Sequence, residues 1–336
     1  MGYSLAKIAE ELGLSKATVS MVINGKARQG RISKDVEQKV KDFCRKVNYV
    51  PNIHAQRINQ KHSGTFGFLV NRVVQENNTN PFSDMNITGI VGGIVLAAEE
   101  LGYRVSIQLY NSDMDENRVF EWLRSHEIDG LIYYGLSIPE NWKKVFAEEK
   151  RCIVGIGTEP GTDISTVNID NFKMSSQLTK HIIEKGRRKF LYMSGADGTF
   201  VSDERKRGCL STLREFDIDI PKENIICAGY SEEKAEEMIL NMKPCVDAII
   251  CGNDDMAIGT IRALKKLGIA VPEDVAVAGG DDIPTGKYTT PQLTSFKNSQ
   301  HQMGVEAVNI LSTMISHGTV VSKIIDSDLI IRESTI

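Results

Sequence analysis

The feature that most constrains the fold is a regular alternation of short apolar runs with segments of helical periodicity. Strands that alternate with helices predict parallel sheets covered by helices on both faces. The apolar runs fall into two groups of four, so we expect an α/β body of two lobes. The strands are predicted at residues 65–70, 103–109, 129–134 and 152–157 in the first lobe and at 189–195, 224–229, 246–252 and 274–280 in the second.

The charge distribution divides the 336-residue chain near residue 62. Residues 1–62 contain 12 Lys and Arg against 5 Asp and Glu, whereas residues 63–336 contain 28 against 39. The net charge of −4 therefore averages a basic segment of +7 and an acidic remainder of −11. A basic arm on an acidic body indicates binding to nucleic acid.

A pair of short helices joined by a tight turn is predicted near the N-terminus. Leu5, Ile8 and Leu12 recur at spacings of three and four, so one face of the first helix is apolar. Gly13 suits a left-handed C-cap, and Ser15 suits the N-cap of the second helix. This arrangement is typical of a helix-turn-helix, although similar pairs occur in proteins that never contact DNA. The basic charge favours DNA binding, because Lys and Arg neutralise phosphates.

The second helix of this pair has one buried and one exposed face. Val19, Val22 and Ile23 form its apolar stripe, which leaves an outward face of Lys16, Ala17, Ser20, Met21 and Asn24. A third helix is predicted to begin after Ser33 as its N-cap and to cover the pair. The loop at residues 25–31 holds three basic residues and two glycines. It can approach phosphates or simply be a solvated loop.

Residues 51–60 have helical spacing over a short segment. Isolated helices shorter than ~12–15 residues are marginal in water. We therefore expect this segment to become helical only when something packs on it, which would make it a switch.

The sequence shows no sign of membrane insertion or export. No run approaches the ~18 consecutive apolar residues that span a bilayer, and the N-terminus lacks the apolar core of a signal peptide. We therefore expect a cytoplasmic protein. The six cysteines are scattered without a Cys-x-x-Cys pair, which indicates reduced structural thiols rather than metal ligands or disulfides.

Polar side chains follow two strands predicted in the second lobe. Asn253 begins an Asn-Asp-Asp sequence after one strand, and Asp281 begins an Asp-Asp pair after another. Ligands of open α/β sheets bind beyond the carboxyl ends of the strands. Adjacent carboxylates can bind Mg²⁺ or act in acid-base chemistry, but the chain has no glycine-rich phosphate loop, no Gly-x-Ser-x-Gly and no His-x-x-x-His. We expect these side chains to bind ligand hydroxyls or cap helices, with no catalytic residue, metal or cofactor.

The N-terminal segment resembles the DNA-binding domain of the lactose/galactose repressor (LacI/GalR) family. The resemblance rests on Ser-Lys-Ala-Thr-Val-Ser-Met-Val-Ile-Asn-Gly from Ser15, on the helix after Ser33, and on Tyr-Val-Pro-Asn from Tyr49. It implies an all-α helix-turn-helix domain over residues 1–50, a hinge helix and linker over 51–62, and double-stranded operator DNA as a partner. The DNA-contacting residues would be Ser15, Lys16, Ala17, Thr18, Ser20, Met21, Asn24 and Ile58.

Two of these residues depart from the family pattern. Ile58 stands where the family has a leucine that wedges into a base step of the minor groove, and isoleucine can also act as an apolar wedge. Met21 stands where arginine is usual and cannot make a bidentate contact to guanine. We expect operator recognition to depend on Lys16, Ala17 and apolar contacts with thymine methyl groups.

Residues 63–336 resemble the effector-binding and dimerisation domain of the same family, which is similar to periplasmic sugar-binding proteins. The resemblance rests on Asn-Pro-Phe from Asn80, on Ser-Asp-Glu-Arg-Lys-Arg-Gly from Ser202, on the run 251–282 and on Thr-Pro-Gln-Leu-Thr from Thr290. It implies an effector bound between the two lobes. The effector-binding residues would be Phe82, Ser83, Arg205, Tyr230, Asn253 and Asp281.

The chemistry of these residue types suits a hydroxylated ligand. The arginine donates a planar fork, the amide donates and accepts, the carboxylate accepts hydroxyl protons, and the aromatic rings offer apolar faces. Ser83 and Gly280 stand where the family often has aromatic residues. These departures predict a roomier pocket.

The sequence thus predicts a homodimeric, sequence-specific DNA-binding transcriptional regulator, acting as a repressor. A small-molecule effector, a sugar or sugar derivative such as a sugar phosphate, would control its operator affinity. A solute-binding protein of a sugar transport system shares the two-lobed body, but it needs an export signal and no basic helix-turn-helix. An enzyme on the same scaffold is the other alternative, because fold alone does not exclude catalysis.

Overall fold

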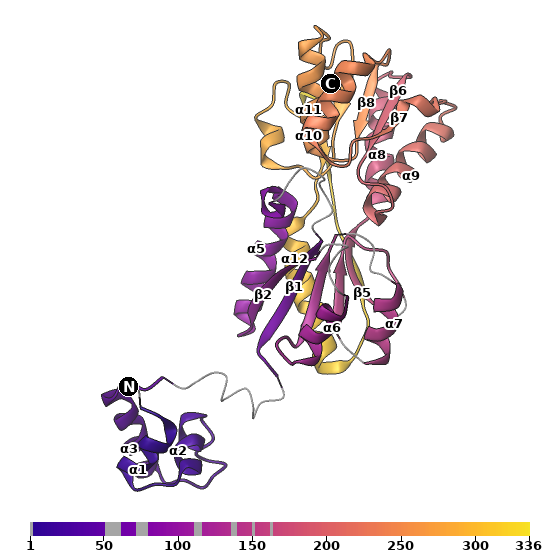
Figure 1. Ribbon diagram of the computed structural model, residues 1–336. Coiled ribbons are helices and arrows are strands. Elements are labelled where there is room, and N and C mark those ends of the chain that lie inside the picture. Colours follow the sequence, from indigo (N-terminus) through magenta and orange to yellow (C-terminus); the bar gives the residue numbers. More distant parts are fainter. Residues whose placement is uncertain are drawn as a thin grey trace. The chain divides into compact units, whose positions relative to one another are not determined.

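The computed structural model describes residues 3–50, 62–71, 80–110, 116–135, 140–149, 152–161 and 164–336. The chain folds into two units, Met1–Ser63 and Gly64–Ile336 (Figure 1). Among the described helices, none is long and apolar enough to cross a membrane. Among the described residues, no two cysteines form a disulfide.

The N-terminal unit contains the three predicted helices, α1 (Leu5–Leu12), α2 (Lys16–Ile23) and α3 (Lys34–Lys46). Gly13 ends α1 with φ of 66°, in the left-handed region that favours glycine. Ser15 and Ser33 cap α2 and α3 by accepting hydrogen bonds from backbone N–H groups in the first helical turn. The predicted caps and helices are therefore confirmed. The core of this unit consists of Ile8, Ala9, Val19, Val22, Ala27 and Val40.

The first lobe of Gly64–Ile336 is built on a six-stranded parallel sheet in the order β11-β5-β4-β3-β1-β2. Its strands are β1 (Thr65–Asn71), β2 (Arg104–Tyr110), β3 (Gly130–Tyr134), β4 (Ile153–Ile156), β5 (Ser165–Ile169) and β11 (Ser322–Ile325). Its helices are α5 (Met85–Glu100), α6 (Glu116–Arg124), α7 (Glu140–Glu148) and α12 (Gln300–His317). The four predicted strands are confirmed, and β5 and β11 are additional.

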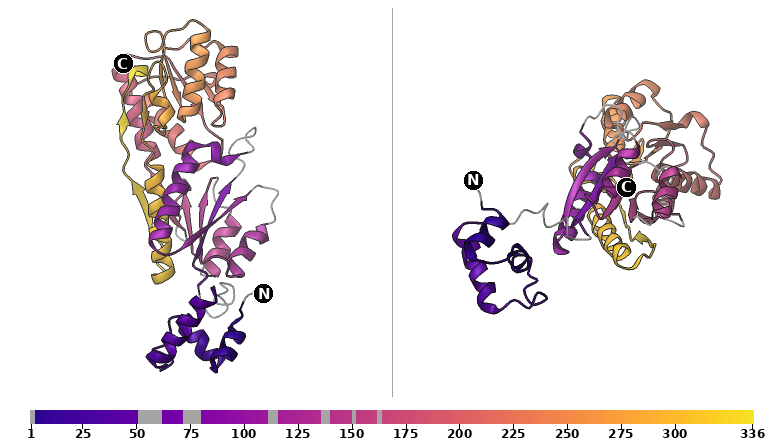
Figure 2. Two further views of the ribbon diagram at one scale, coloured as in Figure 1. Left: turned by 90° about the vertical axis from the view of Figure 1, so that its left-hand side faces the viewer. Right: turned by 60° about the horizontal axis from the view of Figure 1, so that its bottom comes forward.

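Both faces of this sheet are covered by helices (Figure 2). Successive residues of β3 point to opposite faces, so Ile132 and Tyr133 belong to different apolar clusters. Ile132 shares its cluster with residues of α5 and α12. Tyr133 packs with Trp142 and Phe146 of α7. The continuous apolar runs in the sequence reflect this burial on both sides.

The second lobe contains the predicted parallel sheet of four strands, which lie in the order β7-β6-β8-β9. Its strands are β6 (Phe190–Ser194), β7 (Ile225–Cys227), β8 (Ala248–Cys251) and β9 (Ala276–Ala278). Its helices are α8 (Asn171–Glu184), α9 (Phe200–Glu215), α10 (Glu232–Met242) and α11 (Asp254–Lys266). Short 3-10 helices lie at Pro81–Ser83 (η2), Lys222–Asn224 (η3), Pro284–Lys287 (η4) and Glu333–Thr335 (η5).

The chain passes between the lobes after β5, between β10 (Ser295–Phe296) and α12, and between β11 and β12 (Leu329–Ile330). Strands β10 and β12 pair antiparallel beside these passages. Polar residues on the passages and on the facing helix ends therefore lie between the lobes.

Helices α5 and α12 of the first lobe pack with their backbones in close contact (Figure 1). A Cβ atom on Gly93 would lie 2.0 Å from the carbonyl oxygen of His301, and one on Gly304 would lie 2.3 Å from that of Ile90. Only glycine fits at these two positions, because the obstacle is backbone rather than a movable side chain. The close packing holds α12, which begins at the boundary between the lobes, against α5.

Candidate DNA-binding surface and ligand cleft

Helix α2 presents an exposed face, as the sequence predicts. Lys16, Ala17, Met21 and Asn24 are exposed, whereas Val19 and Val22 on the opposite side are buried. This face combines one cation, one amide and two apolar groups. Such a surface can contact phosphates and thymine methyl groups in a major groove.

The remaining predicted contact residues hold the shape of α2. The Ser15 hydroxyl accepts from the Thr18 N–H at 3.0 Å and lies 2.8 Å from the Thr18 hydroxyl. The Ser20 hydroxyl accepts from Asn24 Nδ2 at 3.2 Å. Ser15 is exposed, and Thr18 and Ser20 are half-buried.

Met21 is 41% exposed and packs against the loop that follows α2. A Cβ atom on Gly30 would lie 2.4 Å from the Met21 sulfur. Gly30 therefore makes room for the methionine, which places its apolar end beside the basic loop. Ile58 and the predicted hinge helix lie outside the described residues.

A cavity lies between the two lobes of Gly64–Ile336, with a volume of about 750 Å³ including its opening to solvent. The cavity is lined by Asp84, Asn86, Ile90, Tyr134, Gly135, Gly157, Asn168, Ile169, Asn171, Thr199, Val201, Arg205, Tyr230, Asn253, Asp281, Asn298 and Met303.

Four of the six predicted effector-binding residues line this cavity, namely Arg205, Tyr230, Asn253 and Asp281. Phe82 and Ser83 do not line it. They are exposed residues of η2, and the Ser83 hydroxyl donates to the Asn80 carbonyl oxygen.

The first lobe contributes Asp84 and Asn86 to the cavity instead of Phe82 and Ser83. Asp84 is the N-cap of α5 and accepts from the Asn86 N–H at 2.8 Å. The sequence signal for these residues was present, since Asp84 follows the Asn-Pro-Phe motif and precedes a helical pattern. The structure does not place Phe82 and Ser83 in the cavity lining, and their contact with an effector stays a prediction.

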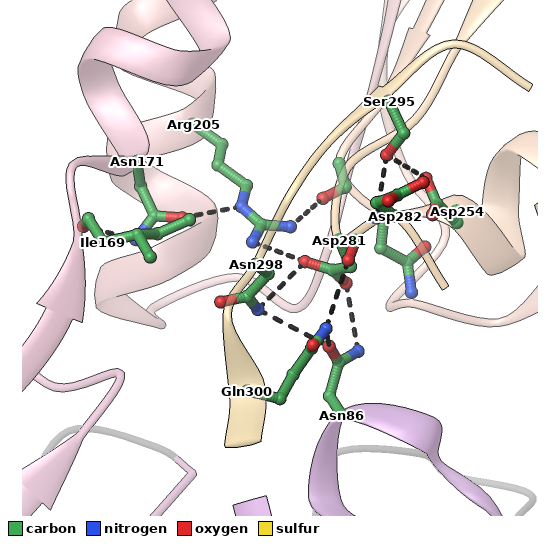
Figure 3. A network of polar contacts seen from close by, with 12 residues as sticks. Asn86, Ile169, Asn171, Arg205, Asp254, Asp281, Asp282, Ser295, Asn298 and Gln300 are labelled. Carbon is green, nitrogen blue, oxygen red and sulfur yellow. Dashed lines mark hydrogen bonds and ion pairs between the residues drawn. The ribbon is translucent and has the colours of Figure 1, made fainter. Parts of the chain in front are cut away.

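Arg205 occupies the centre of a buried polar network (Figure 3). Its Nη2 donates to Asp281 Oδ1 at 2.7 Å, its Nε to Asn171 Oδ1 at 2.8 Å, and its Nη1 to the Gly252 carbonyl oxygen at 2.5 Å. The guanidinium also lies over the Phe296 ring, 4.8 Å from its centroid. Burial opposes the charged guanidinium, but the carboxylate of Asp281 prevails and raises the pKa of Arg205. Arg205 therefore stays charged and joins α9 to α8, to β8 and to the loop after β9.

Asn86 links the first lobe to the same network. Its Nδ2 donates to Asp281 Oδ2 at 3.0 Å, and its Oδ1 accepts from Gln300 Nε2 at 2.7 Å. Asn298, on the passage between β10 and α12, donates to Asp281 Oδ1 at 3.2 Å. Asp281 is thus shared by Arg205 of the second lobe, Asn86 of the first and Asn298 between them (Figure 3). A ligand that changes any of these bonds changes how the lobes are held.

Asp254 and Asp282 have structural partners. Asp254 accepts from the Ser295 hydroxyl at 2.6 Å and from the Ile283 N–H at 2.8 Å, and Asp282 accepts from Arg332 Nη2 at 2.5 Å. Burial raises the pKa of Asp254 to about 8. Both carboxylates fix loops at the carboxyl edge of the sheet.

Asn253 and Tyr230 occupy backbone positions that direct them toward the cavity. Asn253 is the N-cap of α11: its Oδ1 accepts from the Met256 N–H at 3.0 Å, and its Nδ2 donates to Asp255 Oδ2 at 3.5 Å. Tyr230 has a φ of 68°, and a Cβ atom on Gly195 would lie 2.0 Å from its ring. Gly195 therefore admits the ring at the end of β6.

The glycine at position 280 does not enlarge the pocket, which corrects the expectation from sequence. A Cβ atom on Gly280 would lie 2.6 Å from the Phe296 ring and 3.2 Å from Arg205 Nη1. The space next to this residue is therefore already filled by Phe296, an aromatic ring from β10.

Negative charge gathers around the cavity. Burial, together with the nearby carboxylate of Asp281, raises the pKa of Asp84. Burial and the carboxylates of Asp84 and Asp281 raise the pKa of Asp255 to about 7. Within the described part of the chain, no group of three or more His, Cys, Asp or Glu side chains is arranged to hold a metal ion.

Comparison with protein families and curated proteins identifies both parts of the chain. Residues 4–52 match the family described as bacterial regulatory proteins, lacI family, and residues 179–335 match the periplasmic binding protein-like domain. The HTH-type transcriptional regulator CelR of Thermobifida fusca is 28% identical over 98% of both chains. The probable HTH-type transcriptional repressor ExuR of Bacillus subtilis is 27% identical, also over 98% of both.

Solved structures give the same result for the fold. A lac repressor dimer bound to operator and the anti-inducer ONPF matches with a TM-score of 0.87 and 21% identity over 100% of both chains. A complex of the transcriptional regulator CelR with cellobiose matches with a TM-score of 0.73 and 26% identity over 99% of both. The matches to these regulators extend over almost the whole of both chains. They therefore support the prediction of a transcriptional regulator over the alternative of a transport protein. The chain thus carries a DNA-binding domain of the lacI family followed by a periplasmic-binding-protein-like domain, and it is a DNA-binding transcriptional regulator.

Proposed function

We propose that this regulator is a homodimeric repressor whose operator affinity is controlled by a sugar or sugar derivative bound in the cavity between the lobes. Residues 1–50 would bind DNA, 51–62 would form the hinge, and 63–336 would bind the effector and dimerise. The observation that carries the proposal is the shared carboxylate of Asp281, which is bonded to Asn86 of one lobe and to Arg205 of the other.

The cavity supports control by a ligand because its lining joins both lobes. A ligand there competes for, or adds to, the hydrogen bonds that hold the lobes together. Allosteric coupling of this kind is typically ~1–3 kcal/mol and is reciprocal, so operator DNA would change the affinity for the effector by the same factor. The solved structure of a CelR–cellobiose complex supports a sugar as the effector class.

The exposed face of α2 supports contact with the major groove. In a two-fold symmetric dimer, two such helices would reach half-sites of a pseudo-palindromic operator about one helical turn apart. The lac repressor of similar fold is a dimer on operator DNA, which supports the same assembly for this chain. Lys16 would neutralise a phosphate, and Met21 and Ala17 would contact thymine methyl groups.

We further propose that the aspartates at the carboxyl edge of the second sheet have no catalytic role. Both carboxylate oxygens of Asp254 accept hydrogen bonds from structural partners. Asp281 is engaged by an arginine and two amides. Among the described residues, the hydroxyl bonded to Asp254 is that of Ser295, which is fully buried and so cannot reach a substrate.

The test begins with the operator. The full chain would be used to select binding fragments from the DNA of its source genome, and the selected fragment would be labelled for anisotropy titration. We expect sequence-specific binding by a dimer, and a change of about 5- to 150-fold in affinity on adding a sugar that binds the protein. Binding without sequence preference, or sugar binding that leaves operator affinity unchanged, would contradict the proposal.

A further inference from the structure

The cavity contains a buried amide oxygen without a protein partner. Asn168 is 1% exposed, and its Nδ2 donates to the Thr158 carbonyl oxygen at 2.9 Å. A carbonyl oxygen only accepts hydrogen bonds, so this contact fixes which end of the amide is the nitrogen. Asn168 lines the cavity, and its Oδ1 has no hydrogen-bond partner among the described residues. A buried acceptor in this position requires a donor from outside the protein.

Asn298 repeats this arrangement on the passage between the lobes. Its Nδ2 donates to the carboxylate of Asp281 at 3.2 Å, which again fixes the amide orientation. Its Oδ1 is buried and has no partner within the described part of the chain. The residue lines the same cavity as Asn168. Two fixed amide oxygens therefore call for hydrogen-bond donors on the ligand.

Charge around the cavity favours the same kind of ligand. The carboxylates of Asp84 and Asp281 belong to the lining, and Asp255 lies close enough for its charge to interact with both. Arg205 is the one cation among the described lining residues, and three of its N–H groups are taken by Asn171, Gly252 and Asp281. The lining thus offers an excess of acceptors and of negative charge.

We propose that the effector of this regulator is a cationic, polyhydroxylated ligand of the amino-sugar class, with its ammonium group held near Asp84 and its hydroxyl groups donating to Asn168 and Asn298. This inference rests on the proposed function, which places the effector in the cavity. It also excludes sugar phosphates and sugar acids, because their anionic groups would face unpaired oxygens and carboxylates.

Pairs of sugars that are similar in shape but differ in charge would show the effect of the ammonium group on affinity. Calorimetry and thermal unfolding of the full chain would compare D-glucosamine with D-glucose, and the β-1,4-linked dimer of glucosamine with cellobiose. D-Glucose 6-phosphate and D-glucuronate represent the anionic class. A hydrogen bond to a charged group contributes more free energy than one between neutral groups, and the difference corresponds to an affinity ratio of about ten. We therefore expect at least one amino sugar to bind about ten-fold more tightly than its neutral partner. The anionic sugars should not bind.

Asp84→Asn removes the charge and keeps the helix cap, because asparagine caps a helix about as well as aspartate. We expect it to weaken binding of the amino sugar about ten-fold more than it weakens binding of the neutral sugar. Asp170→Asn is the matched control, since Asp170 is the exposed N-cap of α8 and does not line the cavity. Asp255→Asn is a second variant that removes a carboxylate from the same region.

The outcomes distinguish this inference from the function on which it rests. Equal or tighter binding of the neutral sugar, or binding of an anionic sugar, overturns the ligand class while leaving ligand control of operator affinity intact. An absence of binding by both amino sugars to the folded wild-type chain also overturns it. Loss of sequence-specific DNA binding in the selection experiment would instead overturn the proposed function.

Discussion

Arg205 and Asp281 form an ion pair of 2.7 Å in which the two side chains are only 3% and 5% exposed. A buried ion pair adds little net stability, because desolvation offsets the attraction, but removal of one partner leaves an uncompensated charge. Asp281 is also the acceptor for Asn86 and Asn298. The pair therefore fixes the position of the carboxylate that holds the first lobe, and loss of Arg205 alone would destabilise the second lobe.

Replacing Arg205 with methionine should lower the free energy of unfolding by about 3–5 kcal/mol, because the carboxylate of Asp281 would remain buried without a cation. Arg207→Met is the control, since Arg207 is 64% exposed and pairs with Glu204 on the surface, where an ion pair contributes about 1 kcal/mol or less. Urea denaturation of the two variants checks the difference. Similar losses in both would show that Arg205 acts only through its packing.

Replacing Asn86 with aspartate should loosen the connection between the lobes. The substitution keeps the size of the side chain but sets a second carboxylate where Nδ2 now lies 3.0 Å from Asp281. Loss of the bond and the new repulsion should lower the free energy of unfolding by about 1–3 kcal/mol. Asn309→Asp, at an exposed position of α12, should have little effect. Equal stability of the Asn86 variant and the wild type in thermal unfolding would contradict this role.

Two adjacent glycines of α5 should respond to alanine in opposite directions. A Cβ atom on Gly93 would lie 2.0 Å from the His301 carbonyl oxygen, so Gly93→Ala must push α12 away and should cost about 1–3 kcal/mol or more. At Gly92 the nearest atom would be 3.9 Å away, so Gly92→Ala should stabilise the helix by up to about 1 kcal/mol. Thermal unfolding measures both. A loss of stability at Gly92 as large as that at Gly93 would reject the packing argument.

The repeating pattern of the sequence predicted most of the fold because burial on both faces gives a strand an unbroken apolar run. Strands β5 and β11 were missed for the same reason. Strand β5 reads Ser-Thr-Val-Asn-Ile and β11 reads Ser-Lys-Ile-Ile, and polar residues in both interrupt the apolar signal. Their place in the sheet comes from pairing with neighbours far along the chain, such as Ser322 with Thr166, which local sequence does not encode.

Only part of the cavity lining was predicted, because the position of a residue at the end of a predicted strand can be inferred from sequence, whereas that of a loop residue cannot. Asn253 and Asp281 follow strands and were placed by the rule that ligands bind beyond the carboxyl ends. Asn168 and Asn298 were missed. Asn168 lies in a strand that was itself missed, and Asn298 lies on a passage between lobes whose path depends on how the two sheets are connected.

Asp255 should make stability depend on pH. Burial and the neighbouring carboxylates raise its pKa in the folded protein to about 7, above the model-compound value of 3.8. The folded state then holds the proton more tightly than the unfolded state, so the stabilisation is present at low pH and is lost as the pH rises toward 7. The difference in unfolding free energy between the wild type and Asp255→Asn should fall between pH 5 and about 7 and then level off. A difference that is independent of pH over this range would show that Asp255 is ionised throughout.

Lys16 should contribute one phosphate contact to DNA binding. Each phosphate that a protein neutralises adds about 0.9 to the slope of log affinity against log salt concentration, so Lys16→Ala should reduce the magnitude of that slope by about 0.9. Anisotropy titrations of the full chain on a duplex of mixed sequence, at several salt concentrations, measure it. Lys180→Ala, an exposed substitution in the second lobe that pairs with Glu184, serves as the control and should leave the slope unchanged. A different result would contradict this role: the Lys16 variant keeps the wild-type slope and loses affinity only for a selected operator. Lys16 would then contact a base rather than a phosphate, because only phosphate neutralisation releases counterions in proportion to charge.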